Sequence, residues 1–288
     1  MRVLVTGATG YIGSHLVQYL ADSGYTVHAV DNLHHNEYND IRHLCASWRV
    51  CDITRPYAVT GEYDAVVHLA GRSVVPESLK SPYDYYRTNI VGTKTVLDFV
   101  DTGHFLFAST SSAVEMASPY AISKVAAEQV IRETTDDHTI FRFFNVSGTT
   151  GKYKQLGAAT HLIRVAAEVA AGKRDVLEIY GDDYDTPDGT CVRDYVHVVD
   201  LVAAIERAIK YGPQRTHCEN LGSSVGYSVL DVVAAMERVT GKTLPTTIKP
   251  RRAGDAVSCI ATDLSHLMVR MHTLDDMCAS QLYLESNK

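Results

Sequence analysis

The sequence predicts an α/β fold in which a doubly wound parallel sheet is joined by a smaller second domain. Short β-branched or aromatic runs alternate with longer stretches that have helical spacing. The short runs are almost wholly apolar, as expected for parallel strands covered by helices on both faces. A glycine-rich turn, Gly7 to Gly13, separates the first run from the first helical stretch. With 288 residues and 45% apolar composition, the chain is long enough to bury such a core.

Six strands are expected in the first half of the chain. They cover residues 2–7, 25–31, 48–53, 64–71, 105–110 and 138–145. Helical spacing predicts helices between them at 11–22, 83–101 and 119–134. This alternation is typical of a Rossmann domain.

The pattern changes after about Asn145. A polar loop at 148–157 precedes a helix near 160–171, and a loop rich in Asp and Tyr follows at 181–189. Residues 191–209 then have the pattern of a strand and a helix that return to the sheet. We therefore expect a larger domain of residues 1–147 plus about 190–220, and a smaller, discontinuous domain of about 148–189 plus 221–288.

The composition argues against several classes of partner. The formal net charge is −7 and no run of Lys and Arg occurs, so a surface for nucleic acid or membrane lipid is not expected. No apolar stretch reaches transmembrane length, and the chain enters a strand pattern at once, without a leader segment. The six cysteines form no C-x-x-C pair, which predicts reduced thiols, a cytoplasmic protein and no metal site.

The glycine-rich turn predicts a dinucleotide site. Gly7, Gly10 and Gly13 allow a tight turn and the close approach of a pyrophosphate to a helix N-terminus, with Tyr11 and Ile12 inside the same turn. Asp31 ends the second strand, where a carboxylate accepts hydrogen bonds from a ribose and repels the extra phosphate of NADP. NAD is therefore the expected cofactor.

Other strand ends add weaker candidates for cofactor contacts. The carboxyl ends of parallel strands meet at one edge of a sheet, where a dinucleotide would lie. The further candidates are Asn32 after the second strand, Asp52 and Ile53 after the third, Leu69, Ala70 and Gly71 after the fourth, and Asn89 in the helix that follows.

Tyr120 and Lys124 are the predicted acid–base pair. Their spacing of four residues puts both on one helix face, where the ammonium can lower the pKa of the phenol by favouring the phenolate. Ser111 precedes this helix and can complete a hydrogen-bonded set around a sugar hydroxyl. Its neighbours Thr110 and Ser112 are close enough that the choice among the three stays open.

The chain resembles the UDP-glucose 4-epimerase family of extended short-chain dehydrogenases/reductases. The resemblance spans nearly the whole chain and rests on the blocks TGATGYIGSH, DNL, HLAG, PYAISK, FRFFNVSG, IYGDDYDTPDGTCVRDYVHVVDL, NLGSSVGYSV and RRAGD, in this order. It implies that Tyr120 removes the proton of the sugar 4-hydroxyl while NAD, which stays bound, takes up and returns the C4 hydride. It also implies a homodimer built on helices 83–101 and 119–134. The alternative is that the apolar faces of these helices pack entirely against the sheet.

The resemblance also implies a UDP-sugar site in the second half of the chain. Asn145 and Arg193 would contact the diphosphate, Arg252 would bind phosphate and Asp255 the uridine ribose, tasks that suit arginine forks and a carboxylate. His161 and Leu162 would begin a helix whose N-terminus faces the diphosphate. The alternative is that His161 is an ordinary exposed histidine with no role in binding.

Two positions bear on the range of substrates. Ser111 and Tyr120 are nine positions apart, whereas family members have a longer loop there that covers part of the sugar, so substrate access is wider or activity is reduced. Cys259 stands where the family carries either a tyrosine or a small residue beside the sugar C2 group. We expect this smaller residue to admit UDP-N-acetylhexosamines, with a buried thiol as the alternative.

Other functions compete with UDP-glucose/UDP-galactose 4-epimerisation. A nucleotide-sugar dehydratase needs an ionisable pair directly after the active-site Ser or Thr, and Ser112 and Ala113 supply none. A uronic-acid epimerase or decarboxylase stays open, as does a catalytically impaired protein that binds NAD and a nucleotide sugar.

Overall fold

The computed structural model describes residues 1–34, 37–212, 217–252 and 255–287. The chain divides into two compact units, each with its own core. Unit 1 contains Met1–Phe143 and Ile205–Glu219, and unit 2 contains Phe144–Ala204 and Asn220–Lys288. The predicted α/β class, with a doubly wound parallel sheet, is confirmed.

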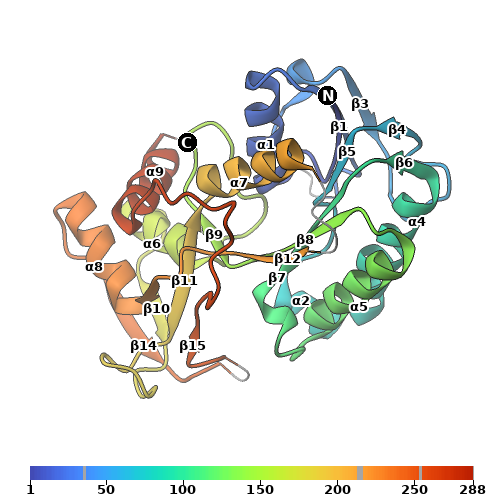
Figure 1. Ribbon diagram of the computed structural model, residues 1–288. Coiled ribbons are helices and arrows are strands. Elements are labelled where there is room, and N and C mark those ends of the chain that lie inside the picture. Colours follow the sequence, from blue (N-terminus) through green and yellow to red (C-terminus); the bar gives the residue numbers. More distant parts are fainter. Residues whose placement is uncertain (35–36, 213–216, 253–254, 288) are drawn as a thin grey trace. The chain divides into compact units, whose positions relative to one another are not determined.

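A seven-stranded sheet forms the centre of unit 1 (Figure 1). Its spatial order is β12-β8-β7-β5-β1-β2-β3, and the pairs from β8 to β3 are parallel. The bounds are β1 Arg2–Thr6, β2 Thr26–Asp31, β3 Ser47–Val50, β5 Ala65–His68, β7 Phe105–Thr110, β8 His138–Phe143 and β12 His217–Leu221. The chain turns from one half of the sheet to the other between β1 and β5, which is where doubly wound folds bind ligands.

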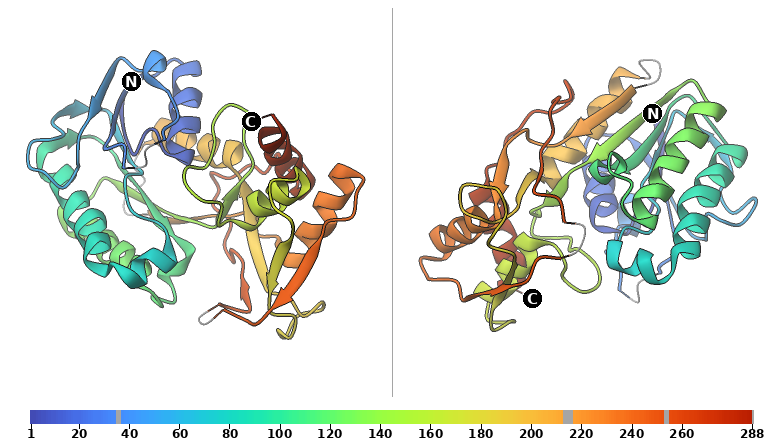
Figure 2. Two further views of the ribbon diagram at one scale, coloured as in Figure 1. Left: turned by 180° about the vertical axis from the view of Figure 1, so that it is seen from behind. Right: turned by 90° about the horizontal axis from the view of Figure 1, so that it is seen from below.

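Helices cover both faces of this sheet. One face carries α1 (Tyr11–Asp22), and the other carries α4 (Gly92–Phe99) and α5 (Pro119–Thr134), which lie side by side in all views (Figure 2). Apolar strand residues fill the space beneath α4 and α5. They include Leu4, Val66, Phe105, Phe107 and Ile140, which pack against Val96, Ala127 and Ile131. The short elements are η1 Arg42–Leu44, α2 Val75–Lys80, α3 Pro82–Tyr86, η3 Ser111–Ala113, and the strand pair β4 Gly61–Tyr63 and β6 Val100–Thr102.

The segment predicted as one helix at 83–101 is divided. After α3 the chain makes a π-helical turn, η2, at Arg87–Val91, continues as α4, and leaves the helix at Val100 to form β6. Buried side-chain contacts of Asn89 in the π-turn account for the interruption. The predicted helices 11–22 and 119–134 have the observed bounds of α1 and α5.

Unit 2 has a small mixed sheet and a pair of parallel strands. β11 (Val192–His197) is its central strand and pairs with β9 (Asn145–Ser147), β13 (Gly226–Ser228) and β15 (Ser258–Cys259). β10 (Leu177–Tyr180) pairs with β14 (Thr246–Lys249). Because every partner of β11 lies in unit 2, residues 190–204 belong there, whereas the predicted boundary placed them in the larger domain.

Three helices enclose the core of unit 2. The C-terminal helix α9 (Leu274–Ser286) packs against α6 (Leu162–Ala170) and α8 (Val229–Thr240), as Figure 2 shows in dark red, yellow-green and orange. Their apolar residues surround Tyr195 of β11. α7 (Val198–Tyr211) runs from unit 2 into unit 1. No helix that the structure describes is both long and apolar enough to cross a membrane.

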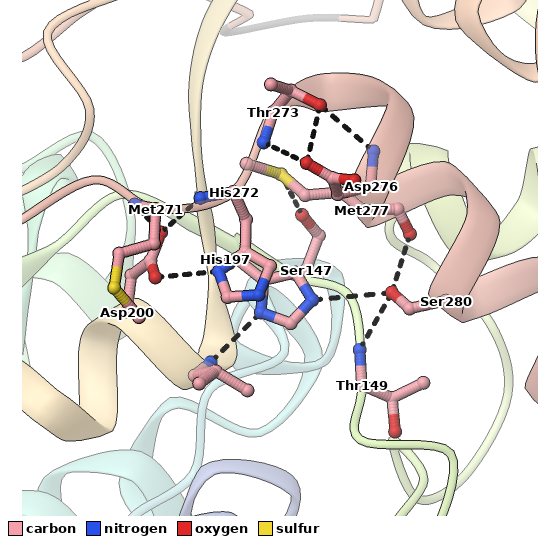
Figure 3. A network of polar contacts seen from close by, with 11 residues as sticks. Ser147, Thr149, His197, Asp200, Met271, His272, Thr273, Asp276, Met277 and Ser280 are labelled. Carbon is pink, nitrogen blue, oxygen red and sulfur yellow. Dashed lines mark hydrogen bonds and ion pairs between the residues drawn. The ribbon is translucent and has the colours of Figure 1, made fainter.

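A polar network anchors the segment that leads into α9 (Figure 3). The buried carboxylate of Asp200 accepts hydrogen bonds from the backbone N–H groups of Met271 and His272, each at 3.1 Å, and contacts His272 Nδ1 at 2.7 Å. The His272 ring stacks on His197 with 4.0 Å between centroids. Ser280 Oγ of α9 lies 3.4 Å from His197 Nε2, so this network also contacts α9 itself.

Candidate functional site

The glycine-rich turn of unit 1 leaves no room for side chains at two positions. Gly7 has φ +68°, and a Cβ there would lie 2.7 Å from the backbone nitrogen of Ala70. A Cβ on Gly13 would lie 2.2 Å from the Gly7 carbonyl oxygen. The backbone therefore makes the close turn that a pyrophosphate site needs, and only glycine fits it.

The same turn presents the start of α1. Gly10 is the N-cap residue and has no side chain with which to cap the helix, whose first residues are Tyr11 and Ile12. The first turn contains no acidic residue that would repel an anion. A helix N-terminus with open N–H groups suits a phosphate.

Asp31 lies at the carboxyl end of β2, beside this turn. Its Oδ2 accepts a hydrogen bond from Thr9 N at 3.0 Å and its Oδ1 accepts one from Leu33 N at 2.9 Å. Each carboxylate oxygen keeps a second lone pair for a ribose hydroxyl. The neighbouring Asn32 is exposed, and its Oδ1 accepts a hydrogen bond from His34 N. The turn, the helix start and this fixed carboxylate together fit an NAD-type dinucleotide.

The candidates after β3 and β5 have different surroundings. Asp52 is half-buried and its Oδ1 accepts a hydrogen bond from Thr54 N at 2.9 Å, whereas Ile53 is buried and would meet a Cβ on Gly92 at 2.6 Å. Ala70 N donates to Thr6 Oγ1 at 3.2 Å, which draws the Leu69–Gly71 segment toward the end of β1. The structure brings these strand ends to one edge of the sheet.

Asn89 has a structural task in the described residues. Its Oδ1 accepts a hydrogen bond from Arg72 N at 2.8 Å, and its Nδ2 donates to Arg72 O at 3.0 Å and to Ser123 Oγ at 2.8 Å. The side chain is almost fully buried and also limits the space at Gly71, where a Cβ would lie 2.9 Å from Oδ1. Asn89 therefore shapes the strand end on which Gly71 lies, rather than offering open donors.

The hydroxyl residues at the end of β7 differ in their surroundings. Thr110 is the last residue of β7 and is buried, and its Oγ1 accepts a hydrogen bond from Ser112 N at 3.2 Å. Ser111 begins the short turn η3 that follows the strand. Ser111 stays the predicted sugar-binding hydroxyl, with Thr110 and Ser112 as its alternatives.

Lys124 is buried one helical turn after Tyr120. Its Nζ donates a hydrogen bond to Ala108 O at 2.7 Å and lies 4.7 Å from the centroid of the Phe107 ring. Burial lowers the pKa of Lys124 to about 8, against the opposing effect of the Glu128 carboxylate. This lysine is therefore poised to exchange a proton near neutral pH.

The predicted lowering of the Tyr120 pKa is wrong for the protein without ligands. Burial raises the pKa of the Tyr120 phenol, and only the hydrogen bond with Thr110 opposes this rise. The ammonium of Lys124 is engaged by the Ala108 carbonyl instead. Tyr120 is accordingly a neutral phenol until a bound group changes its surroundings.

The arginine and aspartate candidates of unit 2 lie near one another. Arg193 of β11 is held by a hydrogen bond from Nη1 to Val192 O at 2.9 Å, and its Nη2 lies 3.9 Å from Asp255 Oδ1. The Arg252 guanidinium stacks over the Tyr180 ring at 3.7 Å from the centroid. Cys259 of β15 is the register partner of Arg193. Ala253 and Gly254 of the RRAGD block lie outside the described residues.

Asn145 and Arg193 are both held by the backbone around Asp194. Asn145 Nδ2 donates to Asp194 O at 3.0 Å. The Asp194 carboxylate is fully buried and accepts hydrogen bonds from Ser223 N, Ser223 Oγ and Ser224 N at 2.7–2.9 Å, and from Ala261 N at 3.2 Å. Asp194 therefore ties β11 to two neighbouring segments at the point where Arg193 emerges.

His161 and Leu162 begin α6 as predicted. His161 is the N-cap residue and is exposed, and its side chain makes no capping hydrogen bond. The first turn of this helix also contains no acidic residue that would repel an anion. Among the described residues, no group of three His, Cys, Asp or Glu is arranged to hold a metal ion.

Two residues of these sites escaped the sequence reasoning. Glu128 is fully buried one turn after Lys124, and Asp194 is buried beside Arg193. Both follow a candidate along the sequence, at spacings of four and one, which is the signal that could have found them. Their importance depends on partners far along the chain, which spacing does not reveal.

Comparison with known proteins supports a single family. Residues 3–219 match the model of the NAD dependent epimerase/dehydratase family. The UDP-glucose 4-epimerase of Azospirillum brasilense is 37% identical over 297 residues, covering 90% of this chain and 83% of that protein. The solved structure of UDP-glucose 4-epimerase from Bifidobacterium longum, in complex with NAD+ and UDP, has a TM-score of 0.90 at 30% identity and covers 100% of this chain and 98% of that one.

A second solved structure extends the range of named substrates among the relatives. The UDP-Glc/GlcNAc 4-epimerase from Campylobacter jejuni has a TM-score of 0.80 at 30% identity, covering 100% of this chain and 99% of that chain. Both the family model and the relatives span most of the chain. The chain belongs to the NAD dependent epimerase/dehydratase family.

Proposed function

We propose that this chain is a UDP-glucose/UDP-galactose 4-epimerase that works by transient oxidation at sugar C4. The observation that carries the proposal lies at the end of β7, where the buried Lys124, one helical turn after Tyr120, donates a hydrogen bond to Ala108 O, and the hydroxyl residues Thr110 and Ser111 follow along the chain. A phenol, a hydroxyl and an ammonium in this order suit proton transfer with a sugar hydroxyl. The naming of the relatives as UDP-glucose 4-epimerases supports the same reaction.

The residues of unit 1 have distinct tasks in this proposal. The Gly7–Gly13 turn and Asp31 would hold NAD, which would supply the acceptor and donor for a hydride at sugar C4. Tyr120 accepts the proton of the 4-hydroxyl and later gives it back, and Ser111, or its neighbour Thr110 in its place, orients that hydroxyl. Lys124 stabilises the phenolate by its positive charge, since burial alone disfavours the charged tyrosine.

The residues of unit 2 suit the nucleotide part of the substrate. Arg193 and Arg252 would bind the diphosphate with their guanidinium forks, and Asp255 would accept hydrogen bonds from the ribose. Asn145 adds an amide beside Arg193. In this proposal these groups bind the nucleotide, and residues of unit 1 carry out the reaction.

The proposed function is tested by the conversion of UDP-galactose. The purified protein should form UDP-glucose without any added hydride donor or acceptor, and denatured protein should release NAD. A protein that releases NAD but makes no UDP-glucose would instead be the catalytically impaired binding protein. Conversion of UDP-glucuronic acid alone would assign it to uronic-acid epimerisation or decarboxylation.

UDP-N-acetylhexosamines are proposed as additional substrates because of Cys259. This half-buried residue pairs in register with Arg193, and its side chain is much smaller than a tyrosine. The relative from Campylobacter jejuni is named for both substrate types. Cys259→Tyr should lower activity on the acetylated substrate far more than on UDP-galactose. Unchanged relative activity on the two substrates would contradict the idea.

We also propose that the protein is a homodimer and is located in the cytoplasm. α5 leaves Ile122 exposed, and the π-turn before α4 leaves Val91 exposed, so this pair of helices offers apolar surface to a second copy. All six cysteines are free thiols in the structure, which suits a reducing compartment.

A further inference from the structure

Glu128 is a buried carboxylate with an unusual number of donors around it. It receives hydrogen bonds from Ser109 Oγ at 2.5 Å and from Arg142 Nε and Nη2 at 3.1 and 2.8 Å. Arg132 Nη2 adds a contact at 3.2 Å. The side chain has no exposed surface. A charge buried this deeply is tolerated only when it is fully paired.

These contacts tie α5 to two neighbouring strands at one level. Ser109 of β7 and Arg142 of β8 are direct register partners, and Glu128 binds both. Glu128 therefore holds α5 at one height on the sheet. A shift of the helix along β7 would break the pair with Ser109 and leave a buried charge unpaired.

The helix face that carries Glu128 also carries the acid–base pair. Tyr120, Lys124 and Glu128 follow one another at intervals of four residues, so they share one face of α5. Two of them meet consecutive residues of β7: Lys124 donates to the carbonyl of Ala108, and Glu128 accepts from the hydroxyl of Ser109.

From this geometry we infer that Glu128 is a positioning residue, which sets Tyr120 and Lys124 against the end of β7 and holds a negative charge beside the Lys124 ammonium. The inference rests on the proposed function, because it concerns the acid–base pair of that reaction. Glu128 itself touches neither substrate nor cofactor in this scheme. Its contacts are with the protein, and its effect passes through Lys124.

The electrostatic part of this role follows from the groups around Lys124. Burial lowers the pKa of Lys124 to about 8, and the Glu128 carboxylate on the same helix opposes the fall. From β5, His68 faces Lys124, but its pKa is lowered to about 3 by burial and by the Lys124 charge, so it is neutral. From α5 itself, Tyr120 is a neutral phenol. Arg142 from β8 and Arg132 face Glu128. Removing the carboxylate should therefore make Lys124 lose its proton at lower pH.

The test compares Glu128→Gln with Glu133→Gln, which removes an exposed carboxylate from the same helix. In Glu128→Gln, kcat for UDP-galactose should fall about tenfold, because acid–base contributions are of this size or larger. KM should change little, and the alkaline limb of the kcat profile should move to lower pH. Glu133→Gln should keep the wild-type profile. Two variants with the same pH profile as wild type would overturn the inference.

Two further variants separate positioning from folding. Glu128→Gln/Arg142→Gln removes both members of the buried pair and leaves only Arg132 without its carboxylate partner, at a side chain that reaches solvent, so the protein should fold and the shifted alkaline limb should persist. Glu128→Asp keeps the charge near Lys124 and should restore the position of the limb. A double variant with the wild-type limb would overturn the inference even if Glu128→Gln is inactive.

A direct titration decides the matter independently of turnover. The NMR shift of the Lys124 side chain, assigned with Lys124→Met, should titrate at lower pH in the double variant than in wild type. If wild-type protein makes no UDP-glucose, the proposed function fails, and this titration still tests the link between Glu128 and Lys124. Identical titrations in the two proteins would overturn it.

Discussion

Tyr120 is the residue on which the proposed chemistry depends. Its phenol can take up and return a proton beside the end of β7. Burial raises the pKa of this phenol, so it needs help to ionise, and in the proposed reaction the buried ammonium of Lys124, one helical turn later, gives that help. The pair is therefore a unit rather than two separate groups.

Replacing the phenol should abolish most turnover without loss of the cofactor. Tyr120→Phe removes the hydroxyl and keeps the ring, so kcat should fall at least about a hundredfold, as for other general acid–base groups. Tyr83→Phe, on an exposed tyrosine of α3, is the matched control. Initial rates with UDP-galactose and the NAD content of each protein are the measurements. Near-wild-type kcat in Tyr120→Phe would exclude Tyr120 as the acid–base residue.

Two glycines with positive φ allow the cofactor turn to be tested against its own control. Gly7→Ala and Gly24→Ala both place a side chain at positive φ, which costs about 1 kcal/mol. Only Gly7→Ala also drives a Cβ into Ala70, since no heavy atom lies within 4 Å of the position at Gly24. Gly7→Ala should therefore lose bound NAD, whereas Gly24→Ala should keep it. Equal NAD content in the two purified proteins would contradict this site.

At the scale of elements, α5 shows what the sequence can reveal. Ser118 caps the helix through Ala121 N and Pro119 opens it, so its limits are set by local chemistry and agree with the prediction. The π-turn around Asn89 depends instead on contacts with Arg72 and Ser123, which periodicity does not encode. The pairing of β10 with β14 was missed for the same reason, because it joins distant parts of the chain.

The placement of Thr110 and Ser111 follows the same division. A cluster of hydroxyls after a strand predicts that one of them serves the site, but the identity of that one depends on where the strand ends. β7 ends at Thr110, and the turn η3 then carries Ser111 away. Which of these hydroxyls serves the site therefore depends on the tertiary structure and not on the local sequence.

The network that precedes α9 makes a separate prediction about stability. Asp200→Ala leaves the backbone donors Met271 N and His272 N without their acceptor, which should cost about 1–3 kcal/mol. Asp275→Asn breaks an exposed pair with Arg238 and should cost less than about 1 kcal/mol. Urea unfolding of both variants gives the comparison. Equal losses would mean that the buried network does not anchor α9.

For the whole molecule, the chain carries its functions on two units with separate cores. Unit 1 has the turn, the fixed carboxylate and the acid–base pair, and unit 2 has the arginines that suit a diphosphate. This division explains why family membership was evident from sequence blocks spread over nearly the whole chain. It also means that loss of one unit's function can leave the fold of the other intact.

The proposed homodimer is tested at the same scale. Ile122→Lys adds a charge to the exposed face of α5 and should convert the dimer to a monomer, because an unpaired charge is costly in a buried interface. Leu230→Lys, on an exposed residue of α8, should leave the dimer unchanged. Light scattering coupled to size-exclusion chromatography reports the mass. A wild-type monomer, or a dimer that survives Ile122→Lys, would contradict the proposed interface.

The central claim is that hydride leaves C4 and returns to the same carbon without exchange. UDP-galactose labelled with deuterium at C4 tests it most directly when the UDP-glucose formed is analysed by NMR and mass spectrometry. We predict that the product keeps the deuterium at C4, with none in the solvent or in added free NADH. Loss of the label to water or to the free cofactor would contradict the proposed retained hydride.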